Sequence, residues 1–192
     1  MRFNVRIRCI SYAAPNINSF ELVSLEGAAL PPFTAGAHIE VYLPGELTRR
    51  YSLHNSPGER HRYVISVLRL PAGRGGSAAM HKKLFAGASL SISEPRNNFE
   101  LVEGAERYVL IAGGIGITPL LAMVSRLDET KSSYVLHYCC RARETAAFLC
   151  SLSEMEATGR ARIHCDGGMP DQRLKFEELF EDITNATHVY CC

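Results

Sequence analysis

The chain has 192 residues, of which 46% are hydrophobic and 21% are charged, and its formal net charge at pH 7 is +1. This length allows one large domain or two small ones with a real hydrophobic core, and the composition is that of an ordinary soluble globular protein. A net charge so close to zero gives no reason to expect nucleic acid or an anionic membrane as the main partner.

The N-terminal half of the chain is expected to form β-structure. Its first residues, MRFNVRIRC, alternate in polarity and carry three arginines, which predicts a first strand and argues against a secretory signal. Strand-like runs occur at residues 2–12, 19–25, 38–44, 49–55, 62–70 and 89–95. Turn residues separate these runs, and one helix is predicted over residues 77–85. Short strands at this spacing indicate an antiparallel β-barrel, which we assign to residues 1–103.

From residue 104 onward, apolar strands alternate with helices. Strands are predicted over residues 108–113, 133–140, 161–166 and 188–192. Helices are predicted over residues 118–128, 142–157 and 176–180. This alternation predicts a parallel sheet with helices on both faces, so residues 104–192 are expected to form an α/β domain. Because nothing follows the last apolar strand, we expect this domain to be incomplete at its C-terminal end.

Two features bear on the compartment of the protein. Residues 108–124 contain no charged side chain, but glycines and a proline interrupt a segment already shorter than the roughly 20 apolar residues of a membrane span. We therefore predict a strand followed by a helix, and no membrane segment. The seven cysteines form no C-x-x-C pair and no zinc-type spacing. Without a signal peptide they are expected to be reduced thiols of a cytoplasmic protein, and no metal site is predicted.

A glycine-rich loop joins the strand and the helix of this apolar segment. Gly113, Gly114 and Gly116 would let backbone N–H groups approach an anion, and the helix beginning at Thr118 and Pro119 adds its positive end. In an open α/β sheet, ligands bind beyond the carboxyl ends of the strands, where this loop is expected. The spacing is not the G-x-G-x-x-G fingerprint, so on its own it also suits a tight turn that packs helix on strand.

Two stretches of the first domain point to related chemistry. TRRYSL places Arg49, Tyr51 and Ser52 close together on a barrel strand; arginine can pair with a phosphate, and tyrosine can stack on a flat ring. On periodicity alone, this stretch also suits an amphipathic edge strand with solvated arginines. GRGGSAAMH places two glycines before Ser77 at a helix N-terminus, which could bind an anion or simply cap the helix. Together, the stretches in the two domains suggest two phosphate-bearing cofactors that face each other across a domain cleft.

The order of six motifs along the chain resembles that of the ferredoxin–NADP⁺ reductase superfamily. These motifs are RRYSL, GRGGS, NNFEL, GGIGITP, HYCCR and HVYCC. The chain is most similar to reductase components of aromatic-ring oxygenase systems, of the phthalate dioxygenase reductase and vanillate O-demethylase reductase type. The resemblance covers essentially the whole chain, and its most specific parts are R-x-Y-S at residues 49–52 and G-G-I-G-I-T-P at residues 113–119.

This resemblance implies a flavin on the barrel domain, FMN rather than the FAD of the wider superfamily. Tyr51 would lie against the isoalloxazine ring, Ser52 would hydrogen-bond near its redox nitrogen, and Arg49 would contact the flavin or its phosphate. The glycines of GRGGS and the serine after them would take the phosphate, and residues of the preceding strand would line the ring and ribityl chain. The further flavin-binding residues implied are Leu53, Val67, Leu68, Arg69, Gly75, Gly76 and Ser77.

The resemblance also implies NADH on the second domain. The residues implied to bind it are Gly113, Gly114, Gly116, Thr118, Tyr138, Cys140, Arg141 and Asp166. Thr118 would reach the contact between nicotinamide and flavin. A carboxylate at Asp166 would suit the free 2′-hydroxyl of NADH and repel the 2′-phosphate of NADPH, although it could equally be a loop cap.

The end of the chain carries one further implication. Cys192 matches a cysteine that lies beside the nicotinamide in relatives, and we expect Ser52, Thr118 and Cys192 to be the catalytic residues. Relatives continue beyond this cysteine into a C-terminal 2Fe–2S domain whose C-x₄-C-x₂-C ligand spacing is missing here. We therefore expect a fragment of a protein that passes electrons from NADH through FMN to a 2Fe–2S ferredoxin domain and then to a terminal Rieske-type oxygenase.

Two other functions remain open. One is a stand-alone NAD(P)H:flavin or ferric reductase, and the other is a non-catalytic flavin-binding subunit that relays electrons. Transfer of a hydride between two juxtaposed cofactors needs no acid or base from the protein. His54, His137 and His164 are therefore expected to be ordinary strand or loop histidines.

Overall fold

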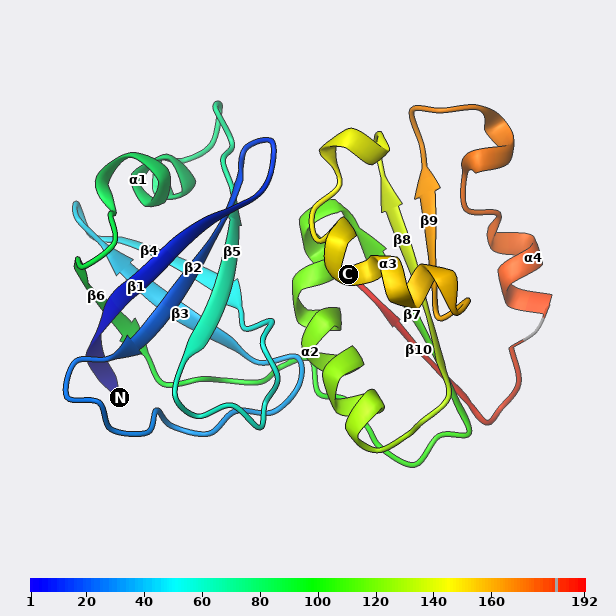
Figure 1. The fold of residues 1–192 in the computed structure, drawn as a ribbon, viewed down its shortest axis with the longest axis horizontal. Coiled ribbons are helices and arrows are strands. Elements are labelled where there is room, and N and C mark those ends of the chain that lie inside the picture. The colour runs from blue at the N-terminus through cyan, green and yellow to red at the C-terminus, as the bar shows by residue number, and fades with distance from the viewer. Residues whose placement is uncertain (182) are drawn as a thin grey trace.

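The computed structural model describes residues 1–181 and 183–192 and divides the chain into two domains that lie side by side (Figure 1). The first is built on a six-stranded antiparallel sheet that curves into a barrel, and the second on a four-stranded parallel sheet with helices. Both architectures predicted from the sequence are confirmed. The predicted boundary at residue 104 falls in the connection between the two sheets.

The barrel domain alternates inward apolar residues with outward polar ones. Its elements are β1 (Arg2–Ala14), β2 (Ile17–Ser24), β3 (His38–Leu43), β4 (Leu47–Ser52), β5 (Tyr63–Leu68), α1 (Gly76–Lys83) and β6 (Ser89–Ser93). The strand order is β4-β3-β6-β1-β2-β5. Past the end of β4 the chain meets β5: the His54 N–H donates to the Val64 carbonyl (3.0 Å), and the Val64 N–H donates to Asn55 Oδ1 (2.9 Å). These bonds close the barrel and bring the end of β4 beside β5.

The second domain places its helices on both faces of the parallel sheet. Its elements are β7 (Arg107–Gly113), η1 (Gly114–Gly116), α2 (Ile117–Glu129), β8 (Tyr134–Cys140), η2 (Arg143–Thr145), α3 (Leu149–Ala157), β9 (Ala161–Cys165), η3 (Pro170–Gln172), α4 (Phe176–Glu181) and β10 (Thr187–Cys191). Helices α2 and α3 pack on one face of the sheet and α4 packs on the other. In the order β10-β7-β8-β9, β8 and β9 are added on one side of β7 and β10 on the other, so the order of the strands reverses at β7. Ligands of open α/β sheets bind at such a reversal, so the carboxyl ends of β7 and β10 mark the expected crevice.

The helix predicted over residues 142–157 is wrong in its first part. Only a short 3₁₀ turn forms there, and the α-helix begins at Leu149 because Phe148 has a left-handed backbone with φ of 65°. The Ala147 N–H donates to the buried hydroxyl of Tyr138 (3.1 Å), and Ala147 packs with Ala14 and Ile17 of the barrel. Contacts with the other domain therefore outweigh the helical propensity of this alanine-rich stretch.

The barrel also contacts the residue before α3 and the segment that connects the two sheets. The ring of His54 lies edge-on to that of Phe148, with centroids 5.2 Å apart. Gly36 has φ of 93°, and a Cβ there would overlap the carbonyl of Phe99 in the connecting segment. This backbone contact holds the connecting segment against the barrel.

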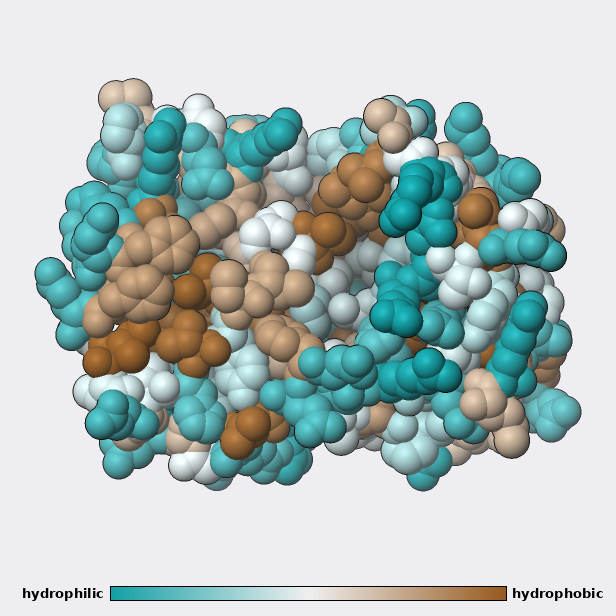
Figure 2. Space-filling view, turned by 180° about the vertical axis from the view of Figure 1, so that it is seen from behind, coloured by the Kyte–Doolittle hydropathy of each residue, from teal (hydrophilic) through white to brown (hydrophobic). Residues whose placement is uncertain are grey.

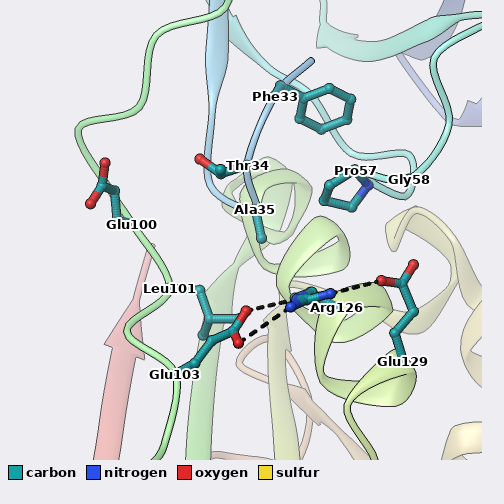
Figure 3. Close-up of a pocket in the computed structure, with 10 residues that line it drawn as sticks. All are labelled: Phe33, Thr34, Ala35, Pro57, Gly58, Glu100, Leu101, Glu103, Arg126 and Glu129. Atoms are coloured by element: carbon teal, nitrogen blue, oxygen red, sulfur yellow. Dashed lines mark hydrogen bonds and ion pairs between the residues drawn. The ribbon is translucent and has the colours of Figure 1, made fainter.

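A polar network joins the domains beside a cavity of about 420 Å³ (Figure 3). Arg126 of α2 donates to both carboxylate oxygens of Glu103 (2.7 and 3.3 Å) and to Glu129 (3.4 Å). Ser56 of the barrel donates to the other oxygen of Glu129 (2.8 Å). Three glutamates line this cavity against one arginine, so it would repel a phosphate-bearing cofactor.

We expect the change Glu129→Gln to lower the free energy of unfolding by less than about 1 kcal/mol, because the ion pair is exposed and solvent-screened. Urea unfolding measures this effect, and the difference from the native chain should shrink in high salt. Glu26→Gln, at an exposed position outside the network, serves as the control. A loss of several kcal/mol would show that the network holds the domains together far more strongly than its exposure allows.

One face of the second domain keeps apolar side chains on the surface, as the view from behind shows (Figure 2). Leu174 and Leu179 pack on the sheet there, but Phe176, Phe180 and Val189 are 49, 51 and 40% exposed. Within the described residues, no helix is long and apolar enough to cross a membrane.

Candidate functional site

A cleft of about 540 Å³ lies between the two domains. Both walls carry residues predicted from the sequence to bind cofactors. Those that line the cleft are Arg49, Tyr51, Ser52, Leu68, Gly76, Ser77, Gly116, Thr118 and Cys192. The structure thus brings together segments that are far apart in the chain, from three parts of the barrel domain and two of the α/β domain.

The barrel wall of the cleft is formed by β4 and β5. Antiparallel pairing with β3 places Arg49 opposite Val41 and Tyr51 opposite Ile39, so both side chains lie on one face of β4. The ring of Tyr51 packs against the barrel core. Burial raises the pKa of Tyr51 to about 12, although the charge of Arg49 acts in the opposite direction. Tyr51 therefore presents a neutral aromatic ring to the cleft at physiological pH.

One end of the barrel wall can hold an anion. Arg49 donates from Nη1 to the Thr48 carbonyl (2.8 Å) and from Nη2 to the Arg74 carbonyl (2.7 Å), which fixes its guanidinium beside the start of α1. A Cβ on Gly76 would overlap the Arg49 side chain, so only glycine allows this approach. The hydroxyl of Ser77 accepts a hydrogen bond from the Leu70 N–H (3.1 Å) and keeps its own proton available.

The N-terminus of α1 adds to this anion-binding character. Gly75 caps the helix in a left-handed conformation with φ of 76°, and the first turn contains no acidic residue. The unpaired N–H groups of a helix start carry partial positive charge. With Arg49 and Arg74 on the same cleft, this end of the wall suits a phosphate.

The α/β wall is formed by the loop after β7 and the start of α2. Gly114 has φ of 51°, which favours glycine, and the first turn of α2 contains no acidic residue. The hydroxyl of Thr118 is buried and donates to the Ile115 carbonyl (3.0 Å). This wall combines a helix N-terminus with a glycine-rich approach, as the sequence predicts.

The loop after β7 also packs against the residue that follows β10, which is a second reason why this loop contains glycine. The Cys192 N–H donates to the Ile111 carbonyl (3.0 Å), and the Gly113 N–H donates to the Cys192 carbonyl (2.7 Å). A Cβ on Gly116 would lie 2.5 Å from the Cys192 carbonyl carbon and oxygen. Gly116 is therefore required for chain packing, whatever it also contributes to a ligand. The Cys192 thiol lines the cleft, and its partial burial raises its pKa, so it remains protonated at neutral pH.

Several predicted residues lie away from the walls of the cleft. The side chains of Leu53 and Val67 belong to the barrel core, so only their backbone groups can face a cofactor. Tyr138 and Cys140 are buried in the α/β domain. The remaining ones are exposed, at the ends of the walls or on the loops after β8 and β9: Arg69, Gly75, Gly113, Gly114, Arg141 and Asp166.

The cleft also contains residues that the sequence interpretation missed. Ser66 is the clearest example: its hydroxyl lies 2.8 Å from His54 Nε2 and 2.6 Å from Ser19 Oγ. Alternation along β5 could have found it, since Ser66 and Leu68 share the strand face opposite the inward Ile65 and Val67. The other missed lining residues are Arg50, Leu70, Ala72, Gly73, Arg74, Ile115 and Pro119.

The histidines near the site carry no positive charge at neutral pH. Burial lowers the pKa of His54 to about 4 and that of His137, helped by neighbouring positive charges, also to about 4. His137 stacks on His164, with His137 Nδ1 and His164 Nε2 3.0 Å apart. Among the described residues, no group of three or more metal-binding side chains is arranged to hold a metal ion.

We expect His137 to make stability depend on pH. An unfolded histidine titrates near pH 6.5, so between about pH 6.5 and 4 the unfolded chain binds more protons than the folded one. The free energy of unfolding should therefore fall as the pH falls through this window, by up to about 1.4 kcal/mol per pH unit. Urea unfolding at pH 7 and pH 5 should show a smaller fall for His137→Asn. The exposed His61→Asn should behave like the native chain, and an unchanged pH dependence in His137→Asn would contradict the expectation.

Comparisons with known proteins agree with this geometry. No family model matches the chain. The chain is 46% identical over 189 residues to the tert-butanol monooxygenase / tert-amyl alcohol desaturase reductase subunit of Aquincola tertiaricarbonis, covering 98% of this chain and 56% of that protein. It is 45% identical over 188 residues to a vanillate O-demethylase oxidoreductase of Pseudomonas sp., covering 98% and 59%. The chain thus spans somewhat more than half the length of these curated relatives.

Solved structures share the fold over the whole chain. A phthalate dioxygenase reductase, described as a modular structure for electron transfer from pyridine nucleotides to a 2Fe–2S centre, superposes with a TM-score of 0.94 at 41% identity, covering 100% of this chain and 60% of that one. An intact type IV self-sufficient cytochrome P450 monooxygenase superposes with a TM-score of 0.92 at 35% identity, covering 100% and 24%. This chain therefore belongs to the ferredoxin–NADP⁺ reductase superfamily, in the group of the phthalate dioxygenase and vanillate O-demethylase reductases.

Proposed function

We propose that this chain binds FMN on the barrel domain and NADH on the α/β domain, and that it is the NADH-oxidising part of an oxygenase reductase. The single observation that carries the proposal is the shared cleft. An aromatic ring on a barrel strand, a phosphate-binding helix start and a glycine loop before a second helix all line it. The names of three relatives, each a reductase or oxidoreductase of an oxygenase or demethylase system, support the same activity.

The residues of the barrel wall fit a flavin mononucleotide. Tyr51 offers a flat, uncharged surface for a ring, and Arg49, Arg74 and the N-terminus of α1 offer positive charge at one end of the cleft. Gly76 keeps the approach to this end open, because a Cβ there would displace Arg49. One anion site on this wall suits the single phosphate of FMN. The remaining flavin-binding roles go to Ser52, Leu53, Val67, Leu68, Arg69, Gly75 and Ser77.

The α/β wall fits a pyridine dinucleotide. Gly113, Gly114 and Gly116 expose backbone at the start of α2, where the helix can hold a pyrophosphate. Tyr138, Cys140, Arg141 and Asp166 would shape the ribose end, at the carboxyl ends of β8 and β9. The carboxylate of Asp166 is exposed there and would favour NADH over NADPH.

The chemistry follows from the way the walls hold two rings together. A bound flavin can accept a hydride from a dihydronicotinamide. It can then release the two electrons of that hydride one at a time. Ser52 and Thr118 line the cleft from opposite walls, and on this proposal they would lie beside the reacting rings. Cys192, a neutral thiol on the same cleft, would pack beside the nicotinamide without adding charge. A cleft that holds the nicotinamide and the flavin against each other makes the hydride transfer faster, because the two rings no longer have to meet in solution in the right orientation.

For the whole protein, we propose that the electrons pass to a 2Fe–2S ferredoxin domain and then to a Rieske-type oxygenase that acts on an aromatic compound. The relatives' names and the description of the solved phthalate dioxygenase reductase support this route. Residues 1–192 by themselves would pass electrons from NADH to an artificial one-electron acceptor such as ferricyanide.

The decisive experiment mixes flavin-loaded protein with NADH in the absence of oxygen. We expect the flavin absorbance near its visible maximum to bleach, and the flavin released on denaturation to run as FMN on chromatography. NADPH should bleach it far more slowly than NADH. Loaded protein that stays yellow with both nucleotides would contradict the reductase function and favour a non-catalytic flavin-binding subunit, and released FAD would overturn the assignment of FMN.

A further inference from the structure

A pair of thiols lies at the carboxyl ends of β8 and β9, away from the lining of the cleft. Cys140 is the last residue of β8 and Cys165 is the last residue of β9, and the parallel register pairs them directly. Their sulfur atoms are 3.9 Å apart. Cys140 is buried, whereas Cys165 is partly exposed and so open to a small reagent.

We propose that Cys140 and Cys165 are a redox-active dithiol, which a hydroperoxide oxidises to an intramolecular disulfide. Neighbouring strands lie about 4.8 Å apart, within the range of about 4.4–6.8 Å between the Cα atoms of disulfide-bonded cysteines. The two sulfurs need only approach each other from 3.9 Å to a bond of about 2.05 Å. Rotation of the side chains, with a small shift of the strand ends, can supply this movement.

No other pair among the seven cysteines, all of which lie in the described part of the chain, shares this placement. Cys139 precedes Cys140 in the same strand and points to the opposite face of the sheet. Cys191 and Cys192 lie at the end of β10, which β7 separates from β8. Cys9 belongs to the barrel, and Cys150 is exposed on α3.

The surroundings favour a defined order of reaction. Arg143 is held by two hydrogen bonds to Glu156 (2.9 and 2.5 Å), and its positive charge acts on both thiols. Burial, together with the neighbouring Cys165 sulfur, raises the pKa of Cys140, and the more exposed Cys165 is the thiol that a reagent from solvent reaches first.

The reaction balances with hydrogen peroxide as the oxidant. The Cys165 sulfur loses its proton and attacks one peroxide oxygen. The O–O bond breaks, and the departing hydroxide takes up that proton, which leaves a sulfenic acid and one water. The Cys140 thiol then attacks the sulfenic sulfur: the S–S bond forms, the S–O bond breaks, and the hydroxide leaves with the thiol proton as a second water. Overall, two thiols lose two electrons and two protons, and one peroxide is reduced to two waters.

The disulfide would act on the loops that leave these two strand ends. The Asp166 N–H donates to the Cys140 carbonyl (2.8 Å), and the Gly167 N–H donates to the Arg141 carbonyl (2.8 Å). A Cβ on Gly167 would lie 2.5 Å from that same Arg141 carbonyl oxygen, so the two loops already pack closely. Drawing the sulfurs together would shift the two strand ends, and the loops that leave them would move with them. On the proposed function these loops hold the ribose end of NADH, so oxidation should weaken NADH binding.

Peptide mapping tests the dithiol directly and needs no nucleotide. The full chain is treated with hydrogen peroxide, its remaining thiols are alkylated, and its peptides are mapped without reduction. We expect a cross-linked peptide pair joining Cys140 to Cys165, about 2 Da lighter than the sum of the reduced peptides, that dithiothreitol reverses. Cys140→Ser and Cys165→Ser should each lose this product, and Cys150→Ser should keep it. Oxidation of the exposed thiols without this cross-link would overturn the proposal.

A second measurement tests the consequence for NADH. The dissociation constant of NADH should rise at least about fivefold in the oxidised protein, return on reduction, and stay constant when Cys165→Ser protein is treated in the same way. An unchanged constant in protein shown to carry the cross-link would refute the effect on binding. Failure of the reduced protein to bind NADH at all would instead count against the proposed function, and the mapping result would still decide the dithiol.

Discussion

Arg49→Ala protein is expected to bind FMN roughly 10- to 100-fold more weakly than the native chain. The guanidinium of Arg49 is fixed beside the N-terminus of α1 by its bonds to the Thr48 and Arg74 carbonyls, so its charge is already placed when a phosphate arrives. Hydrogen bonds to a charged group contribute about 1.5–3 kcal/mol, which corresponds to this loss. Quenching of flavin fluorescence during a titration of the apoprotein measures the dissociation constant.

A second variant at position 49 separates the effect of charge from that of geometry, and a variant at another arginine serves as the control. Arg49→Lys should recover part of the affinity, because lysine keeps the charge but cannot reproduce the planar, two-pronged contact. Arg6→Ala, at an exposed position of β1, should leave the affinity unchanged. If Arg49→Ala bound FMN as tightly as Arg6→Ala, the phosphate would not lie at this end of the cleft.

Gly116→Ala protein is expected to bind NADH at least about tenfold more weakly while keeping its affinity for FMN. The added Cβ would lie 2.5 Å from the backbone of Cys192, so either the end of β10 or the start of α2 has to move. Overpacking of this kind usually costs about 1–3 kcal/mol, and here the displaced atoms belong to the proposed dinucleotide wall. Anaerobic titration of the flavin-loaded protein with NADH, followed by absorbance, measures the change.

Gly58→Ala is the matched control for this substitution. Its Cβ would meet only side-chain atoms at ordinary contact distances of 3.5 and 3.6 Å, outside the cleft. The Gly58→Ala protein should therefore keep both affinities. A Gly116→Ala protein that bound NADH normally would show that the loop can relax around the methyl group, and that this wall is not a close-fitting part of the site.

Much of the fold could be predicted because its elements are local patterns of polarity. The alternation of β1 to β6 and the apolar runs of β7 and β8 each depend on neighbouring residues, and burial of one or two strand faces explains them directly. The prediction failed at residues 146–148, where the backbone follows contacts with the barrel and the hydroxyl of Tyr138. Such contacts join residues that are distant in the chain, and propensity does not encode them.

Part of the candidate site could likewise be predicted from local sequence patterns, and part could not. Period-two geometry places Arg49 and Tyr51 on one face of a strand, and glycines before a helix indicate an anion-binding turn. The sequence by itself therefore determined two domains and the kind of ligand that each could hold. Only the tertiary structure decided that both walls meet in one cleft, that Ser66 and Arg74 belong to it, and that Gly116 is needed for the approach of Cys192. The physical reason is that local patterns report how each segment buries its own surface, whereas a site between domains depends on how two finished surfaces pack against each other.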